Sequence, residues 1–262
     1  MIPENAITEW RSTVPWNNPE QVEQDLLICR SIVEIFKDTY LSSRLAFRGG
    51  TALHKLYVKP QARYSEDIDL VQIKAEPIKK TLDALRNALA FLGEPVIKQK
   101  KNNNTLVFRI ESEIMPIVPL HIKIEINCKE HFSVFGWSKL EFNVINQWYK
   151  GKCSINTYLL EELLGTKLRA LYQRKKGRDL FDIYKVCKSQ NIDMDKVIHC
   201  YTSYMKFSVD TLPTKRQFML NLEQKMKDPA FLGDITFLLR PNEFFDFKEA
   251  CLFVKNKLID KL

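Results

Sequence analysis

The sequence predicts an α+β protein in which a mixed β-sheet with flanking helices is followed by an all-helical domain. Two observations support this prediction. Before residue 150, apolar and polar residues alternate along several short runs, as in strands with one buried face. From Leu159 onward, apolar residues recur at helical spacing instead. We therefore expect an α/β catalytic domain over 1–150 and a helical domain with a basic surface over 151–262.

The N-terminal domain is expected to open with a long helix, because Asn18 suits an N-cap and Pro19 suits a first turn. Gly49 and Gly50 interrupt the pattern after a short strand, and Gly93 stops a later helix. The predicted helices span 19–40, 51–58 and 77–92, and the predicted strands span 45–47, 67–73, 96–99, 106–110, 119–127, 139–145 and 155–158, with a turn at 102–104.

The C-terminal domain is divided by prolines at positions 213, 229 and 241, which we expect to lie between helices. The predicted helices of this domain span 159–174, 178–189, 193–206, 215–227 and 243–257.

Composition limits the class of protein. The 262 residues are 45% apolar and carry a formal net charge of +8, so the chain has enough material for a core and favours a polyanionic partner. Residues 151–262 hold 20 basic and 14 acidic residues, against 20 and 18 in residues 1–150, so most of the excess lies in the second domain.

The six cysteines show no zinc-ligand spacing, which predicts buried thiols and a cytoplasmic protein. The sequence shows neither an export signal nor a stretch apolar enough to span a membrane, so we expect no membrane partner.

The segment SEDIDLV places two carboxylates on one strand face, because Asp67 and Asp69 are two residues apart while Ile68 and Leu70 point to the core. Two aligned carboxylates repel each other unless a cation lies between them, and Mg²⁺ prefers oxygen ligands. Two acids separated by one residue are by themselves more often solvated residues of an exposed strand, so the neighbouring sequence decides.

The turn Arg48-Gly49-Gly50-Thr51 lies at a predicted junction of strand and helix, where backbone amides and the helix N-terminus favour phosphate oxygens. A pair of glycines alone usually serves only the turn. Arg63 and Ser65 lie just before the carboxylates, where they would reach bound phosphates if the loop folds over the site.

The segment PLHIKIEIN alternates again and places Glu125 on the polar face of a core strand, beside His121, Lys123 and Asn127. Glu125 is the candidate third carboxylate of a site able to bind two Mg²⁺ ions for in-line phosphoryl displacement. The alternative is an exposed strand with mixed charges.

These segments resemble the nucleotidyltransferase superfamily, and more specifically the AbiEii-type toxins of bacterial toxin–antitoxin pairs. The matching residues are GGTAL, RYSEDIDLV and IKIEIN, followed by LLGTKLRAL over 163–171 and RDLFD over 178–182. Together they span residues 47–184.

The resemblance implies an enzyme that uses Mg²⁺, or Mn²⁺, and an NTP. It implies that Gly50 and Thr51 contact the nucleotide phosphates, that Asp67 and Asp69 hold the metal, and that Lys167 neutralises the triphosphate. Asp179 would be the acid of the last motif, preceded by Arg178 as a substrate-binding candidate. The implied acceptor is RNA, in particular the tRNA 3′ end, and the implied partner is a cognate antitoxin.

The residues themselves also favour Lys167, which opens a basic run ending at Arg178. Such runs are usually solvated helix faces, and Arg178 and Asp179 could equally form a structural salt bridge, with Asp182 as a surface acid or a second partner. If the run binds RNA, charge-neutral changes at Lys175 and Lys176 should weaken a salt-dependent affinity.

The leading hypothesis is therefore nucleotide transfer to an RNA acceptor, which would block translation. One alternative is a phosphoryl or nucleotidyl transferase acting on a protein. A second alternative is a module that binds RNA or a partner without catalysis.

Overall fold

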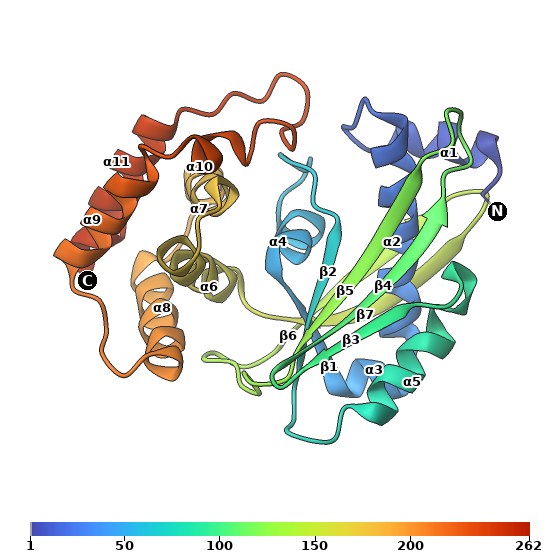
Figure 1. Ribbon diagram of the computed structural model, residues 1–262, viewed down its shortest axis with the longest axis horizontal. Coiled ribbons are helices and arrows are strands. Elements are labelled where there is room, and N and C mark those ends of the chain that lie inside the picture. Colours follow the sequence, from blue (N-terminus) through green and yellow to red (C-terminus); the bar gives the residue numbers. More distant parts are fainter. Residues whose placement is uncertain (1) are drawn as a thin grey trace. The chain divides into compact units, whose positions relative to one another are not determined.

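The computed structural model describes residues 2–262 and divides into two compact units, Met1–Tyr158 and Leu159–Leu262 (Figure 1). Each unit is described by itself. The division falls after the position expected from the sequence, because a strand over Lys150–Thr157 still belongs to the sheet of the first unit.

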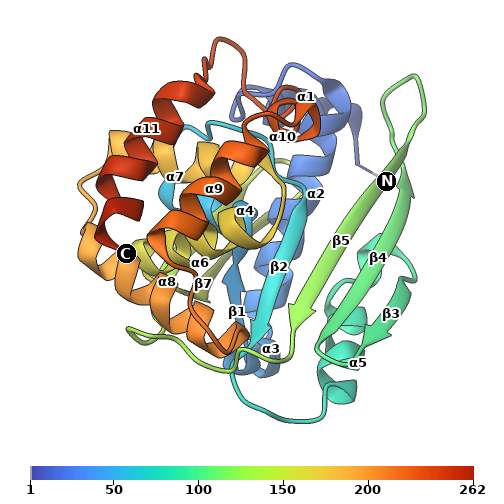
Figure 2. The ribbon, with the colours of Figure 1, turned by 60° about the vertical axis from the view of Figure 1, so that its left-hand side comes forward.

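The first unit contains a seven-stranded mixed sheet with the order β3-β4-β5-β2-β1-β7-β6. The central strand β2 pairs antiparallel with β1 and parallel with β5, and β1 also pairs parallel with β7. Figure 2 shows β2, β5, β4 and β3 side by side. The strands are β1 (Leu45–Arg48), β2 (Asp67–Gln72), β3 (Val96–Lys100), β4 (Asn103–Glu111), β5 (Pro119–Asn127), β6 (Ser138–Ile145) and β7 (Lys150–Thr157).

Strand alternation builds the core of this unit. Ile68 and Leu70 of β2 and Ile122, Ile124 and Ile126 of β5 are buried on one face of the sheet. The long helix α2 (Pro19–Lys37) packs against strands β5, β6 and β7. The opposite side of β2 and β5 is thereby left to carry polar residues.

The predicted helix over 19–40 is broken at Asp38. Asn18 caps α2 by accepting the N–H of Glu20, as predicted, but Asp38 adopts extended backbone and accepts the N–H of Leu41 at 2.8 Å. Asp38 thus ends α2 and caps a separate helix, α3 (Thr39–Arg44), because its short carboxylate competes for backbone donors.

The remaining helical segments of the first unit flank the sheet. The helix over Glu4–Arg11 was not predicted from the sequence. The turn of the β3-β4 hairpin lies at residues 101 and 102, slightly earlier than predicted. The segments are α1 (Glu4–Arg11), α4 (Gly49–Ala52), which continues into a π-helix, η1 (Leu53–Tyr57), then α5 (Lys79–Ala88) and the short 3₁₀ helix η2 (Ala90–Leu92).

The second unit is helical, as predicted. Gly165 allows α6 and α8 to approach closely, because a Cβ there would lie 2.5 Å from the Cβ of Cys200. Pro229 begins a short helix, where the analysis placed it between helices. The elements are α6 (Leu160–Gln173), α7 (Gly177–Ser189), α8 (Met194–Ser208), α9 (Lys215–Lys225), α10 (Pro229–Gly233), α11 (Phe247–Lys257) and η3 (Ile259–Lys261). Within residues 2–262, no helix has the length and apolar character needed to cross a membrane.

Candidate active site

Two carboxylates of β2 lie beside a third on β5. In the parallel pairing of these strands, Asp69 stands opposite Glu125 and Asp67 stands opposite Lys123. On the other side of β2, Arg48 of β1 stands opposite Asp69. Because residues in register share one face of a sheet, these five side chains belong to one polar row on the first unit.

Lys123 pairs with two of these acids. Its Nζ lies 3.7 Å from Asp67 Oδ2 and also contacts Glu125 Oε1. Partial burial would lower the pKa of Lys123, but the hydrogen bond to Glu125 and the negative charges of Asp67 and Asp69 outweigh that effect and raise it. The sequence analysis placed Lys123 on this face without assigning it a role.

The position of the Lys123 ammonium indicates whether the site suits a metal ion. It shows that these acids hold a cation between them. Yet the His, Cys, Asp and Glu side chains of residues 2–262 do not gather in threes as a preassembled metal site. Mg²⁺ is commonly held by one or two carboxylates together with substrate phosphates and water. Asp67 and Asp69 therefore fit a metal that binds with its nucleotide.

Gly49 fixes the turn beside these carboxylates. Its φ is +79°, a conformation that residues with a side chain rarely adopt, and a Cβ on it would lie 2.1 Å from Asp69 Oδ2. The Asp69 carboxylate thus packs directly on the turn. A glycine is required here both for the backbone conformation and for the close approach of the acid.

The turn is also joined to the loop that precedes β2. The Thr51 hydroxyl hydrogen-bonds to Ser65 Oγ at 2.9 Å and to the backbone carbonyl of Asp67. The guanidinium of Arg63 lies against Gly50 and donates to the carbonyl of Tyr64 at 2.9 Å. Arg63 and Thr51 are both buried. The loop over 61–65 thus packs against the glycine turn, and these hydrogen bonds hold the two segments together.

Arg48 is tied to an acid that the sequence analysis did not single out. Its Nη1 lies 2.6 Å from Glu130 Oε2, and both side chains are largely buried. Glu130 lies just after β5, and its backbone N–H is held by Asn127 Oδ1 at 2.8 Å. Nothing in the spacing of the sequence pairs Arg48 with residue 130, because the contact depends on how the loop after β5 returns to the sheet.

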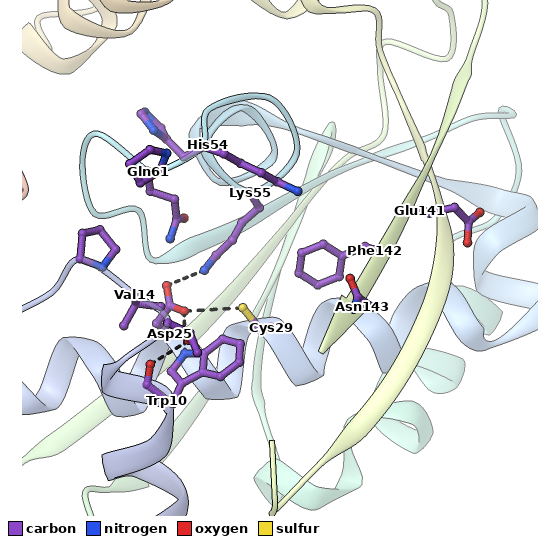
Figure 3. Close-up of a pocket in the computed structure, with 14 residues that line it drawn as sticks. Trp10, Val14, Asp25, Cys29, His54, Lys55, Gln61, Glu141, Phe142 and Asn143 are labelled. Carbon is purple, nitrogen blue, oxygen red and sulfur yellow. Dashed lines mark hydrogen bonds and ion pairs between the residues drawn. The ribbon is translucent and has the colours of Figure 1, made fainter. Parts of the chain in front are cut away.

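The helix that follows the glycine turn is anchored by a buried ion pair. Lys55 Nζ lies 2.5 Å from Asp25 Oδ2, and the same carboxylate accepts from Trp10 Nε1 at 3.0 Å and from Trp16 Nε1 at 3.1 Å. Figure 3 shows Asp25 with Trp10 and Lys55 at the wall of a 320 Å³ cavity. Burial would lower the pKa of Lys55, but Asp25 outweighs that effect and raises it. The cluster thus anchors the helix of the glycine turn to α2.

A second hollow, of 380 Å³, opens directly beside Asp67. It lies where β5 extends beyond the first residue of β2, and it reaches β4 at Val107. Its lining also includes Gln24, His121 and Lys123. The carboxylate face therefore has room for a group larger than an ion.

The second unit contains a separate, buried ion cluster. Lys167 Nζ lies 3.1 Å from Asp179 Oδ1 and 2.8 Å from Asp182 Oδ2. Arg174 donates two hydrogen bonds to Asp179, from Nε at 2.7 Å and from Nη2 at 2.9 Å. Burial alone would raise the pKa of Asp179, but the charges of Lys167 and Arg174 hold it below its usual value. Asp182 is fully buried and pairs with Lys167, so its interpretation as a surface acid is wrong.

The rest of the basic run is also paired within the second unit. Lys175 lies 2.5 Å from Asp228, and Lys176 lies 3.1 Å from Asp234. Arg178 Nε lies 3.5 Å from Asp234 as well, so Arg178 forms its salt bridge with this acid and not with its neighbour Asp179. The run that looked like a free basic face is largely neutralised by acids distant in the sequence.

Comparisons with known proteins agree with this architecture. Residues 32–250 match the family described as nucleotidyl transferase AbiEii toxin, type IV toxin–antitoxin system. A search of curated proteins found no match.

Several solved structures share the fold. MenT4, a nucleotidyltransferase toxin from Mycobacterium tuberculosis H37Rv, aligns with a TM-score of 0.67 and 16% identity over 100% of this chain and 91% of its own. JHP933 from Helicobacter pylori aligns with a TM-score of 0.57 and 19% identity over 100% and 94%. A second H. pylori structure, titled a putative nucleotidyltransferase, gives 0.57 and 19% over 93% and 96%.

The family match covers most of the chain and includes both the carboxylate strands and the Lys167 cluster. The chain belongs to the AbiEii family of nucleotidyltransferase toxins of toxin–antitoxin systems.

Proposed function

We propose that this toxin transfers a nucleoside monophosphate from an NTP to an RNA acceptor, the 3′ end of tRNA, in a Mg²⁺-dependent reaction in the cytoplasm that blocks translation. The observation that carries the proposal is the packing of Asp69 on the Gly49 turn, beside Asp67 on the same strand face. This arrangement brings carboxylate oxygens that suit a metal and a turn that suits phosphates together within the first unit. Family membership implies an NTP substrate and an antitoxin partner.

In this proposal Asp67 and Asp69 hold Mg²⁺, or Mn²⁺, and Glu125 joins them when Lys123 moves aside. When bound, the metal supplies charge neutralisation at the phosphates. The backbone amides of the turn at Gly49 and Gly50 bind phosphate oxygens. The acceptor hydroxyl forms its bond to the α-phosphorus as the bond to pyrophosphate breaks, so catalysis consists chiefly of positioning and electrostatics.

The other candidate residues act on position and charge. The hydrogen bond between Thr51 and Ser65 fixes the turn, and the Arg63 guanidinium packs against Gly50. Arg48 places positive charge beside Asp69.

In the second unit, Lys167 is proposed to neutralise the triphosphate, with Asp179 as the residue that positions its ammonium. Arg178 remains a proposed contact to substrate.

The test is transfer of label from each of the four α-³²P NTPs to total tRNA with Mg²⁺, compared with the Asp69→Ala variant. Label on tRNA that disappears in the variant would support the proposal and identify the nucleotide. Label that appears only on protein would replace the RNA acceptor with a protein acceptor. No label from any NTP on either acceptor would contradict nucleotide transfer by this chain alone.

A further inference from the structure

The polar row of the active site continues beyond the carboxylates to the edge of the sheet. Glu125 stands opposite Thr105 of β4, and Thr105 stands opposite Lys98 of β3. With Asp69 and Arg48, this row crosses five strands on one face. Three strand spacings of about 4.8 Å separate β2 from β3, so Lys98 lies roughly 14 Å from the row position of Asp69.

This part of the face is open to solvent. On β4, Leu106 and Phe108 are fully buried on the core side, whereas Arg109 on the other side is exposed. Lys98 and Lys100 of β3 are exposed as well, and register places them on the same side as Arg109. The face therefore presents cations along strands β3 and β4, next to the carboxylates of β2 and β5.

These cations are not paired with acids in the part of the chain that the structure describes. Among the residues that the structure describes, Lys98, Lys100 and Arg109 form no ion pair, and neither does Lys101 in the hairpin turn. The single acid that β4 adds to this side is Glu111, at its end. Exposed cations of this kind attract phosphates, whereas the paired lysines of the second unit must first release their acids.

The hollow beside Asp67 joins the two parts of the face. It is lined by Val107 of β4, by His121 and Lys123 of β5 and by Glu66. Arg109 stands opposite His121, and Lys98 lies two residues along β3 from the position that faces Val107. A terminal nucleoside placed in this hollow would have its 3′ hydroxyl next to Asp67. The phosphates that precede it would then extend toward β3.

We propose that the face formed by Lys98, Lys100 and Arg109 is the platform for the single-stranded 3′ end of the RNA acceptor, with the terminal nucleoside in the hollow beside Asp67. This inference rests on the proposed function, because it names the surface that presents the acceptor to the same site. The length of the face, about 14 Å from β2 to β3, suits a few nucleotides of single strand. The face does not have the length that binding along an RNA duplex would require.

The test compares two variants that remove the same charge from the same sheet. The platform variant is Lys98→Gln/Lys100→Gln/Arg109→Gln. The control variant is Lys139→Gln/Lys150→Gln/Lys152→Gln, at the opposite edge of the sheet on β6 and β7. These lysines are exposed and form no ion pair with any residue in the described range 2–262. Fluorescence anisotropy measures the affinity of each folded variant for 5′-labelled tRNA across a range of salt concentrations.

We expect the platform variant to bind tRNA at least about tenfold more weakly at 0.1 M salt, and to reduce the slope of log affinity against log salt by about 2, since each phosphate contact on a single strand contributes about 0.7. The control variant should stay within about twofold of the parent. Equal losses in the two variants, or an unchanged slope in the platform variant, would overturn the platform.

Label transfer separates this inference from the proposed function. In the platform variant, KM for tRNA should rise while KM for the NTP is unchanged. If the parent transfers no label to RNA but the tRNA affinity still depends on the platform, the proposed transfer fails and the platform stands. If transfer occurs equally well in both variants, the platform fails and the transfer stands. Competition by an acidic protein but not by RNA would assign the face to a protein partner and overturn the inference.

Discussion

The two units each contain a lysine between two acids, but in opposite surroundings. In the first unit, the side chains of Lys123, Asp67 and Glu125 are 38%, 39% and 31% exposed. In the second, Lys167 is 6% exposed and its partners Asp179 and Asp182 are fully buried. Breaking an exposed ion pair costs little free energy, so the exposed set can exchange its lysine for a metal and a substrate. Breaking a buried ion pair leaves an unpaired charge away from water and costs much more. We therefore expect metal binding to depend on the first set, and we expect the second set to contribute more to stability than the first.

The largest effect should come from the exposed set. Asp69→Asn removes a charge needed for metal binding and keeps the shape of the side chain, so kcat for label transfer should fall about 10³-fold or more. The melting temperature should stay the same or rise slightly, because repulsion between neighbouring carboxylates is relieved. Initial rates and calorimetry measure both quantities. A rate within tenfold of the parent would contradict the assignment.

The buried set should instead govern stability. Asp179→Ala leaves Lys167 with one acid in a dry environment, and we expect the free energy of unfolding to fall by about 3–5 kcal/mol. Glu94→Ala, which removes the exposed partner of Arg86, serves as the control and should have little effect. Urea unfolding measures both. Equal effects in the two variants would remove the distinction between buried and exposed pairs.

Two glycine variants distinguish the effect of backbone strain from the effect of the contact between the turn and Asp69. Gly49→Ala should lower stability by about 1–3 kcal/mol and reduce the transfer rate, because the new methyl group displaces the Asp69 carboxylate. Gly93→Ala is a matched control, since Gly93 also has positive φ, +85°, but nothing within 4 Å of a Cβ. It should lose stability without losing rate. If Gly49→Ala retained full activity, the close packing of Asp69 on the turn would not matter for catalysis.

The pKa of Asp179 gives the buried set a pH dependence. The pKa of Asp179 is lower in the folded state than in the unfolded state, where it is near 3.8. The ionised carboxylate therefore stabilises the fold at pH values above the unfolded pKa, and this stabilisation is lost as the pH falls through the folded pKa. Acid titration of the unfolding midpoint should therefore be steeper below about pH 4 in the parent than in Asp179→Asn. Parallel curves for the two proteins would contradict this assignment.

The smallest effect should come from the paired surface lysines. Lys175→Gln/Lys176→Gln breaks ion pairs whose lysines are exposed, and Asp234 keeps its second partner Arg178, so the melting temperature should change by no more than about 1 °C. The affinity for tRNA should change less than in the platform variant. A tenfold loss would show that this run, as the sequence alone suggests, provides the main RNA contacts.

Much of the site was predictable because it depends on periodicity. Alternation in SEDIDLV and PLHIKIEIN indicated which residues of β2 and β5 share the polar face, and the register of the strands agrees. The pairing of Arg48 with Glu130 was not predictable, since the loop after β5 decides it.

The partners of the basic run were not predictable for the same reason. Spacing shows that Lys175 and Lys176 lie together, but only the packing of the second unit brings Asp228 and Asp234 to them. Asp38 was missed because its competition for backbone donors is local and leaves no trace in the apolar pattern.

Binding of Mn²⁺ in the presence of a non-hydrolysable NTP analogue, followed by electron paramagnetic resonance, tests the central claim most directly. If the exposed carboxylates hold the metal where the Lys123 ammonium lies, Asp69→Asn should weaken binding at least about tenfold. Lys123→Met should bind as tightly as the parent or more tightly, because it removes the competing cation. Asp179→Asn, compared at a temperature where it is folded and at saturating analogue, should bind Mn²⁺ like the parent, because Asp179 contacts Lys167 and not the exposed carboxylates. Unchanged Mn²⁺ binding in Asp69→Asn would contradict the account.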